Sequence, residues 1–121
     1  MKTLIAASAA FMLSAFAASA ANAQWVGYAV NDFGFGKAYG SSEVGARNAA
    51  IDRCEQNTSR TCEDDQTYSV SVRVDSWYIV AIKCGGSRAV AGSEHSFAQA
   101  KRNAAEKLGE SPSNCTITHS E

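Results

Sequence analysis

Four cysteines are the residues of this 121-residue chain whose chemistry is most constrained by type and spacing: Cys54, Cys62, Cys84 and Cys115. An even number of cysteines in a small chain favours two disulfides where the compartment is oxidising. A zinc site needs paired Cys-x-x-Cys ligands or a nearby set of Cys and His, and neither spacing occurs here. We therefore expect two bridges with a stabilising role, each contributing about 2–4 kcal/mol.

Four cysteines allow three pairings, and spacing alone does not choose among them. We favour Cys54–Cys62, because a short polar loop joins the two residues, together with Cys84–Cys115, each of which lies on an expected strand. A pairing of Cys54 with Cys84 and of Cys62 with Cys115 would instead tie the two halves of the chain together. That alternative stays open.

The sequence contains no recognisable catalytic constellation, so we expect no catalytic residues and no enzyme. The only histidines are His95, just before an expected helix, and His119, at the fraying end of the chain, and we expect both to be exposed. A serine hydrolase would also need a nucleophile on a sharp turn such as Gly-x-Ser-x-Gly, which is missing. Glycoside cleavage needs two carboxylates at a suitable separation, and the sequence singles out no pair.

Two motifs have a superficial likeness to ligand sites. Gly34 to Gly40 (GFGKAYG) is glycine-rich like a phosphate loop, but it lies inside an alternating strand pattern, where glycines allow close packing. Glu63-Asp64-Asp65 is a carboxylate run, but calcium loops need alternating ligands and a distant bidentate Glu. We expect no cofactor-binding residues, no metal ligands and no cofactor.

The first 23 residues have the three parts of a secretory signal peptide: a short basic start at Lys2, an apolar run, and Ala21-Asn22-Ala23. We expect cleavage between Ala23 and Gln24 and a secreted or periplasmic product of 98 residues (121 − 23). The remaining charge is 10 − 12 = −2, since Lys2 is lost. This size and charge exclude a multi-domain enzyme, a basic nucleic-acid binder and a polytopic membrane protein.

Hydrophobic periodicity predicts the elements that position these residues. We expect a hairpin over 25–39 with one small-residue face, a helix over 42–55, and strands over 68–74 and 77–82, the last apolar on both faces and therefore central. The chain then returns over 88–91, forms a helix capped by Ser96, and ends in a strand over 115–118. The side chains expected to be buried in the two helices are Val44, Ala46, Ala50, Ile51 and Cys54 in the first, and Phe97, Ala100, Ala104 and Leu108 in the second.

The two halves of the chain resemble each other. The stretch from Ala29 to Ser41 aligns with 81–93 at an offset of 52, and Arg-Asn-Ala-Ala recurs at 47–50 and 102–105. We therefore predict an α+β fold with a duplicated ββαβ unit, two helices packed on antiparallel sheets, and disulfide stabilisation. Residues 24–121 form a single domain in this prediction, with halves at about 25–75 and 76–119.

These residues together resemble domain-of-unknown-function family 4189. The likeness covers nearly all of 25–118 and rests on Tyr28-Ala29, the Gly-x-Gly-x-x-Tyr-Gly-Ser hairpin, the alanine-rich helices and the cysteines. It implies a small exported bacterial protein with no established activity and no catalytic residues to carry over. Family members often have another Cys at the end of the second helix, where this chain has Lys107-Leu108-Gly109, so their pairing is not transferred.

We expect a non-enzymatic binding module that acts on a host or cell-envelope macromolecule. The alternatives are an inhibitor or immunity protein of a cell-wall hydrolase, and a small enzyme acting on extracellular polymer. We expect no nucleic-acid partner and no stable membrane insertion after signal cleavage, and the sequence leaves the oligomeric state open. One or two aromatic residues at a hairpin edge would anchor the partner. The cations on the two helices, Arg47, Arg53, Lys101, Arg102 and Lys107, favour a solvated, salt-bridged face over an anion-binding one.

Overall fold

The computed structural model describes residues 23–75 and 77–121, so residues 1–22 of the predicted signal peptide lie outside the described residues. Each half of the described chain has the order ββαβ. The first half contains β1 (Trp25–Asn31), β2 (Gly34–Gly40), α2 (Glu43–Thr58) and β3 (Ser69–Arg73). The second contains β4 (Tyr78–Cys84), β5 (Ser87–Ser93), α3 (Phe97–Lys107), a short 3-10 helix (Pro112–Asn114) and β6 (Thr116–Ser120).

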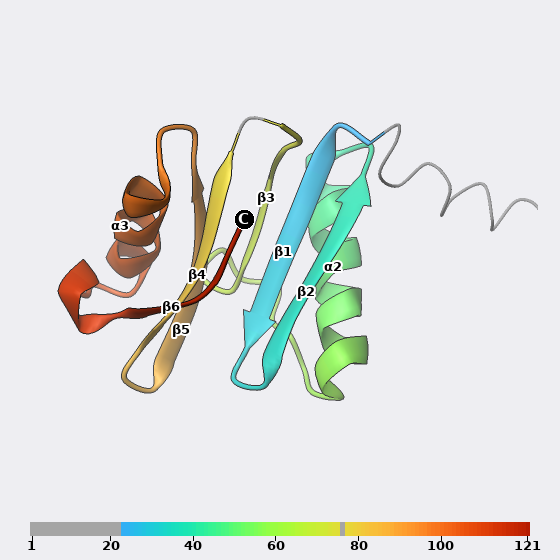
Figure 1. The fold of residues 1–121 in the computed structure, drawn as a ribbon. Helices are drawn as coiled ribbons and strands as arrows, with labels where there is room; N and C mark the ends of the chain where they lie inside the picture. The colour runs from blue at the N-terminus through green and yellow to red at the C-terminus, as the bar shows by residue number, and fades with distance from the viewer. Residues whose placement is uncertain (1–22, 76) are drawn as a thin grey trace, which may run out of the picture.

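The elements form four layers, α2, sheet A, sheet B and α3 (Figure 1). Sheet A has the strand order β2-β1-β3 and sheet B the order β5-β4-β6, and both are antiparallel. Each helix covers the outer face of its own sheet, and the two inner faces pack together. The predicted fold class, α+β with a duplicated ββαβ unit and two disulfides, is confirmed.

Alternation along each strand explains why both faces of the sheets are buried. The core between the sheets contains Val26, Tyr28, Val30 and Val72 from sheet A and Ile79, Ala81 and Val90 from sheet B. The intervening residues of β4, Val80 and Ile82, point instead toward α3. The expectation of an apolar, central strand over 77–82 is therefore met by β4.

Glycine on the outer face of sheet A allows α2 to approach closely. A Cβ atom on Gly36 would lie 2.2 Å from the Cys54 backbone nitrogen and 2.5 Å from the Ala50 oxygen, and one on Gly27 would lie 2.3 Å from the Ala46 oxygen. These contacts are with backbone, which cannot move aside as a flexible side chain would. The small-residue face predicted for the hairpin is thus the surface on which α2 packs.

Two helix residues that we expected to be buried are exposed. Val44 is 66% exposed in the first turn of α2, where it borders an open polar cavity beside β3. Phe97 is 41% exposed at the first residue of α3, where its ring meets the edge of Tyr78 with centroids 4.9 Å apart. The serine caps are as predicted: Ser42 Oγ accepts from Gly45 N–H and Ser96 Oγ from Gln99 N–H, both at 3.0 Å.

The two ββαβ units superpose in a different register from the one that sequence alignment suggests. Asn31 and Gly34 flank the first hairpin turn, and Cys84 and Ser87 flank the second, an offset of 53 (84 − 31) rather than 52. A shift of one residue reverses the face of every strand side chain. At the offset of 52, Ala29, which faces α2, would be matched with a residue that faces the inter-sheet core.

The corrected register relates the two disulfides. The structure joins Cys54 to Cys62 and Cys84 to Cys115. Cys62 and Cys115 each follow the helix of their own half, yet the two cysteines have different partners. Cys62 bonds to the helix, whereas Cys115 bonds to a strand residue whose counterpart, Asn31, lies 3.2 Å from Cys62 Sγ. The cysteine after the helix is therefore bonded to the helix in the first half and to a strand in the second half.

We predict that replacing Gly36 by Ala lowers the free energy of unfolding by about 2–3 kcal/mol, because the new methyl group overlaps the α2 backbone. Gly86→Ala is the matched control, since a Cβ there meets nothing within 4 Å. Urea unfolding of both variants measures the difference. Equal stability of the two variants would show that α2 does not pack on the glycine face as described.

Candidate functional site

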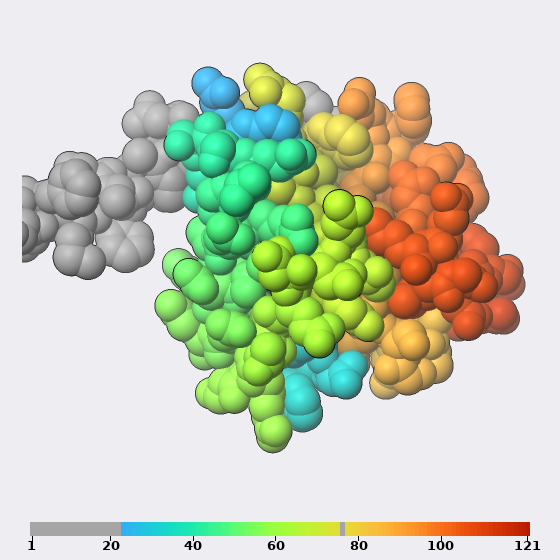
Figure 2. Space-filling view, turned by 180° about the vertical axis from the view of Figure 1, so that it is seen from behind, coloured from blue at the N-terminus to red at the C-terminus, as the bar shows by residue number. Residues whose placement is uncertain are grey.

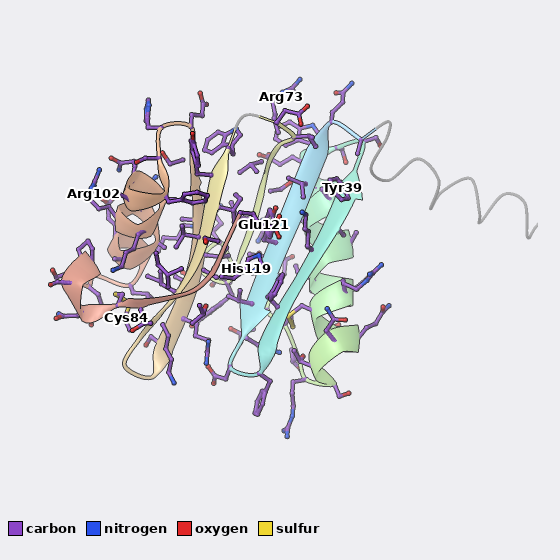
Figure 3. All side chains as sticks on the ribbon, viewed as in Figure 1. Tyr39, Arg73, Cys84, Arg102, His119 and Glu121 are labelled. Atoms are coloured by element: carbon purple, nitrogen blue, oxygen red, sulfur yellow. A yellow bond between two sulfur atoms is a disulfide. The ribbon has the colours of Figure 1, made fainter. Side chains whose placement is uncertain are left out.

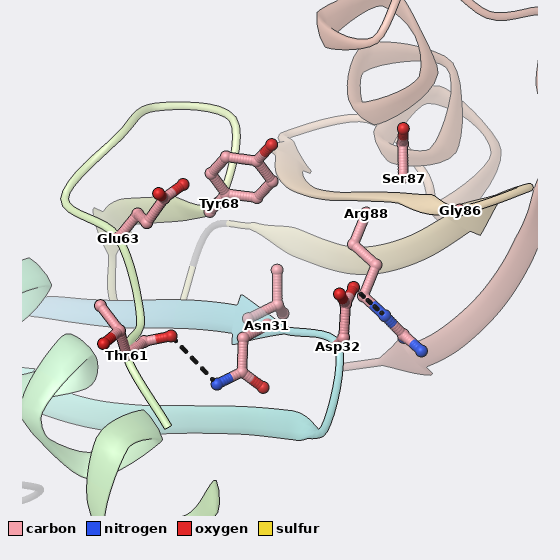
Figure 4. Close-up of a pocket in the computed structure, with 9 residues that line it drawn as sticks. Asn31, Asp32, Thr61, Glu63, Tyr68, Gly86, Ser87 and Arg88 are labelled. Carbon is pink, nitrogen blue, oxygen red and sulfur yellow. Dashed lines mark hydrogen bonds and ion pairs between the residues drawn. The ribbon is translucent and has the colours of Figure 1, made fainter. Parts of the chain in front are cut away.

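A polar cavity of about 310 Å³ opens at the end of the molecule where the two hairpins turn (Figure 4). Its lining comes from three segments that are distant in sequence: the β1–β2 turn, the loop after α2, and the β4–β5 turn. The polar lining residues used below are Asn31, Asp32, Glu63 and Arg88. Loops carried by a rigid scaffold are the usual place for binding residues.

Asn31 holds two of these segments together. Its Oδ1 accepts from the backbone N–H groups of Phe33 (2.8 Å) and Gly34 (3.1 Å), which fixes the β1–β2 turn. Its Nδ2 donates to Thr58 Oγ1 at 2.8 Å, at the end of α2. The adjoining loop is closed by the Cys54–Cys62 bridge. The turn and the loop are therefore joined by side-chain hydrogen bonds and braced by a covalent link.

Phe33 is the exposed aromatic residue that this bracing presents. It occupies the tip of the β1–β2 turn with 64% of its surface exposed. The guanidinium of Arg60, on the braced loop, lies 4.4 Å from the centre of the Phe33 ring, a cation–π contact. We call Asp32, Phe33, Arg60, Glu63 and Arg88 the hairpin-end surface. A large apolar side chain that is exposed to solvent is a candidate binding residue, and the Phe33 ring is also held in place by its surroundings.

Charged groups line the cavity beside the β1–β2 turn. Arg88 Nε lies 3.3 Å from Asp32 Oδ1, an ion-pair contact that does not have hydrogen-bond geometry. Asp32 and Glu63 are exposed, whereas Arg88 is largely buried. The hairpin-end surface thus contains two carboxylates and two guanidinium groups and has no net charge.

Of the two histidines, the structure places one as expected and one differently. His95 is exposed. His119 is not at a fraying end: it lies in β6, its ring stacks on Phe35 with centroids 4.1 Å apart, and its Nε2 is 2.8 Å from Glu121 Oε2. Figure 3 shows His119 and Glu121 between the two sheets. The strand pairing of β6 with β4 holds them there.

Glu121 is the centre of a polar group that closes the β2/β6 side of the sandwich. Its Oε1 accepts from Tyr28 Oη (2.7 Å) and pairs with the Lys37 ammonium. Burial acts to raise the pKa of the Glu121 carboxyl, but the hydrogen bonds from Lys37, Tyr28 and His119 outweigh it and hold this pKa below its usual value. Burial, followed by the Glu121 contact, raises the pKa of Tyr28. The group joins sheet to sheet and serves as a brace.

Two of the helix cations bind groups outside their own helices. Arg47 Nε donates to Ser69 Oγ (2.8 Å) and its Nη2 pairs with Asp64 at 2.6 Å. Lys107 Nζ donates to the backbone oxygens of Gln66 (2.6 Å) and Val90 (2.8 Å), which links the two halves. Sequence periodicity missed these roles because they depend on loops whose path it does not describe.

Arg102 and the acidic run from Glu63 to Asp65 also form contacts that the structure describes. Arg102 Nη2 donates to Gln99 Oε1 at 2.8 Å, within α3. Glu63, Asp64 and Asp65 are exposed in the loop after α2, and Asp65 Oδ1 accepts from Thr67 N–H at 2.7 Å. Within the described residues, no group of three His, Cys, Asp or Glu residues is arranged to hold a metal ion.

No family model, curated protein or solved structure matches this chain. Among the helices in the described part of the chain, none is long and apolar enough to cross a membrane.

We predict that Asn31→Ala accelerates hydrogen exchange at the amides of Phe33 and Gly34 by at least about tenfold, because both lose their acceptor. NMR-detected exchange measures this directly. Asn57→Ala is the control, since Asn57 makes a single exposed bond to the Phe35 oxygen. Unchanged exchange at both amides in Asn31→Ala would contradict the bracing of the turn.

We predict that Glu121→Gln removes about 1 kcal/mol of stability above pH 4.5, the ordinary pKa of this carboxyl. Because the folded-state pKa is lowered, this contribution is present above the unfolded pKa and is lost as the pH falls through the folded value. The gap between the wild type and the variant should therefore close as the pH falls below 4.5 in urea unfolding curves. Glu110→Gln, at an exposed position, should show no gap at any pH. A gap that widens in acid would contradict this sign.

Proposed function

We propose that this chain is a small exported, disulfide-stabilised, non-enzymatic module that binds a host or cell-envelope macromolecule through its hairpin-end surface. The observation that carries the proposal is Phe33, a mostly exposed aromatic ring on a turn fixed by Asn31 and a disulfide-closed loop. Aromatic residues with arginine and a polar rim are the usual energetic centres of interfaces.

Rigidity supports binding because ordering a loop on association costs free energy. The Phe33 backbone is already held by a hydrogen bond to Asn31, and Arg60 lies over the ring before any partner arrives. Few additional side chains or backbone groups must become ordered when a partner covers this surface. The neighbouring cavity offers hydrogen-bonding groups that can complement polar atoms around the aromatic contact.

The balance of charge favours a partner of mixed chemistry over a polyanion. Asp32 and Glu63 oppose Arg60 and Arg88 on the hairpin-end surface, so nucleic acid is not favoured. The two disulfides suit an oxidising compartment, secreted or periplasmic. Cleavage between Ala23 and Gln24 and membership of domain-of-unknown-function family 4189 stay predictions.

A small enzyme acting on extracellular polymer is a second candidate, supported by the two carboxylates that line the cavity, Asp32 and Glu63. Asp32 is already engaged with Arg88, which leaves one carboxylate without an ion-pair partner among the described contacts. The binding proposal needs no further group. Inhibition of a cell-wall hydrolase would be one form of the binding function at the same surface.

We predict that Phe33→Ser lowers the retention of a binding partner by at least about tenfold, since a hot-spot aromatic contributes 2 kcal/mol or more. The immobilised exported chain is incubated with separate host-surface and cell-envelope extracts, and bound material is quantified by mass spectrometry. Phe97→Ser is the matched control, because Phe97 is an exposed phenylalanine on the helix side of the molecule.

The outcomes separate the two candidates. Loss of retention in Phe33→Ser with normal retention in Phe97→Ser supports the binding module. Equal retention by both variants contradicts it. Release of fragments from polymer by the wild type, abolished in Glu63→Gln and normal in Phe33→Ser, supports the enzyme instead.

A further inference from the structure

A cavity of about 460 Å³ is lined by residues of β3 in sheet A and of β5 in sheet B. Trp25, which lines it, pairs with Arg73 at the end of sheet A that is opposite to the β1–β2 turn. In Figure 2, the start of β1 (blue) and the end of β3 (yellow) lie at this end of the molecule. The cavity shares no lining residue with the hairpin-end surface, so it is a separate candidate site.

Two indole rings form much of the apolar wall of this tryptophan-lined cavity. Trp25 begins β1 and Trp77 precedes β4, and both side chains are half-buried, so part of each ring stays accessible. The Arg73 guanidinium lies 5.3 Å from the centre of the Trp25 ring, a cation–π contact that restrains it. A Cβ atom on Gly92 would lie 3.1 Å from Trp77 Cε3, so the bare backbone of Gly92 leaves room beside this ring.

The charged side chains that line the cavity are exposed and balance one another. Glu43 and Glu94 contribute two carboxylates. Arg73 and Lys107 contribute two cations. A rim with equal numbers of positive and negative groups favours a neutral ligand over an anion or a cation. A purely aliphatic ligand is disfavoured, because it would cover polar groups without offering them hydrogen bonds.

Two of the polar lining groups are already oriented. Asn103 Oδ1 accepts from Gln99 Nε2 at 2.9 Å and Asn103 Nδ2 donates to the Gly92 oxygen at 3.0 Å, which fixes the amide. Lys107 Nζ donates to two backbone oxygens. An amide nitrogen has two N–H donors and an ammonium group has three, so each keeps one donor for a ligand.

A hydroxyl group without a partner also lines the cavity. Ser71 Oγ is buried and has no hydrogen-bond partner in the part of the chain that the structure describes. A buried polar atom that lacks a hydrogen bond costs free energy. Because a hydroxyl both donates and accepts, a hydroxyl group of a ligand would satisfy Ser71 in either direction.

A sugar ring has the combination of surfaces that this cavity complements. One face of a pyranose presents C–H groups, whose partial positive charge is attracted to the negative face of an aromatic ring. Its edge presents hydroxyl groups, which bond to carboxylates, amides and hydroxyls alike. Trp77 also lines an adjoining cavity of about 210 Å³ together with Tyr39 and Asp75, so the surface continues beyond the length of one ring.

We propose that the tryptophan-lined cavity binds a neutral oligosaccharide. Its sugar rings lie against Trp25 and Trp77, and its hydroxyl groups bond to Ser71 Oγ, to Asn103 Nδ2 and to the two rim carboxylates. The chain of sugars continues toward Tyr39. This binding is independent of the hairpin-end surface.

The test uses the exported chain with four trisaccharides in mildly acidic buffer. Triacetylchitotriose and cellotriose are neutral, chitotriose is the cationic, deacetylated form of the first, and trigalacturonic acid is anionic. Trp25 and Trp77 are the two tryptophans of the chain, so their emission reports occupancy of the cavity. We expect at least one neutral trisaccharide to shift the emission and to bind at least about tenfold more tightly than both charged ones.

Trp25→Ala should weaken this neutral trisaccharide about tenfold in calorimetric titrations, because a stacking surface is lost. Trp25→Tyr keeps an aromatic ring and should retain the affinity to within a fewfold factor. Tyr78→Ala is the matched control, since Tyr78 is a partly exposed aromatic residue that begins β4 and lines neither cavity. Its affinity should equal that of the wild type.

Circular dichroism and the unfolding midpoint check that Trp25→Ala is folded. If it is not, saturation-transfer NMR on the wild type decides, since irradiation of the indole protons should saturate the C–H protons of the bound sugar. Three results overturn the proposal: no emission change with either neutral trisaccharide at millimolar concentration, equal affinity for neutral and charged trisaccharides, and unchanged affinity in folded Trp25→Ala. An emission shift with 1-octanol and with none of the sugars would identify an apolar ligand and overturn it as well.

Discussion

The close approach of α2 to sheet A is the contact on which the rest of the first half depends. Gly27, Gly36 and Gly40 bring the backbone of the helix against the backbone of the sheet, so the inner face of the same strands is free to present large residues to sheet B. Because β1 is apolar on both faces, sheet A can serve as an interior layer. The position of α2 also determines where the Cys54–Cys62 loop reaches the β1–β2 turn.

The two ββαβ units have a common plan and differ in the surfaces that they present. On the β2/β6 side, Tyr28, Lys37, His119 and Glu121 bridge the sheets. On the β3/β5 side, small residues and a few bonds from Lys107 leave adjoining cavities. At the hairpin end, the first turn presents Phe33 whereas the second consists of Gly85 and Gly86. The scaffold is repeated, but the surfaces are not.

Local sequence patterns were enough to predict the element order and the fold class. The alternation of apolar and polar residues and the serine caps depend only on residues that are a few positions apart. The prediction that Val44 and Phe97 are buried was wrong, because a stripe of apolar residues along a helix does not reveal where the sheet beneath the helix ends. The repeat register was wrong by one residue because small residues recur on both faces of the strands. The bracing of Phe33 by Asn31 could be suspected from the Asn-Asp turn, but the exposure of the ring depends on loops that meet only in the folded chain.

We propose that this protein meets its partner at the hairpin end. The most direct measurement is photo-crosslinking in the cells that produce the chain, with benzoylphenylalanine in place of Phe33 in one variant and of Phe97 in another. We expect a discrete covalent adduct from position 33 and none from position 97. No adduct from either position, or the same adducts from both, would contradict it.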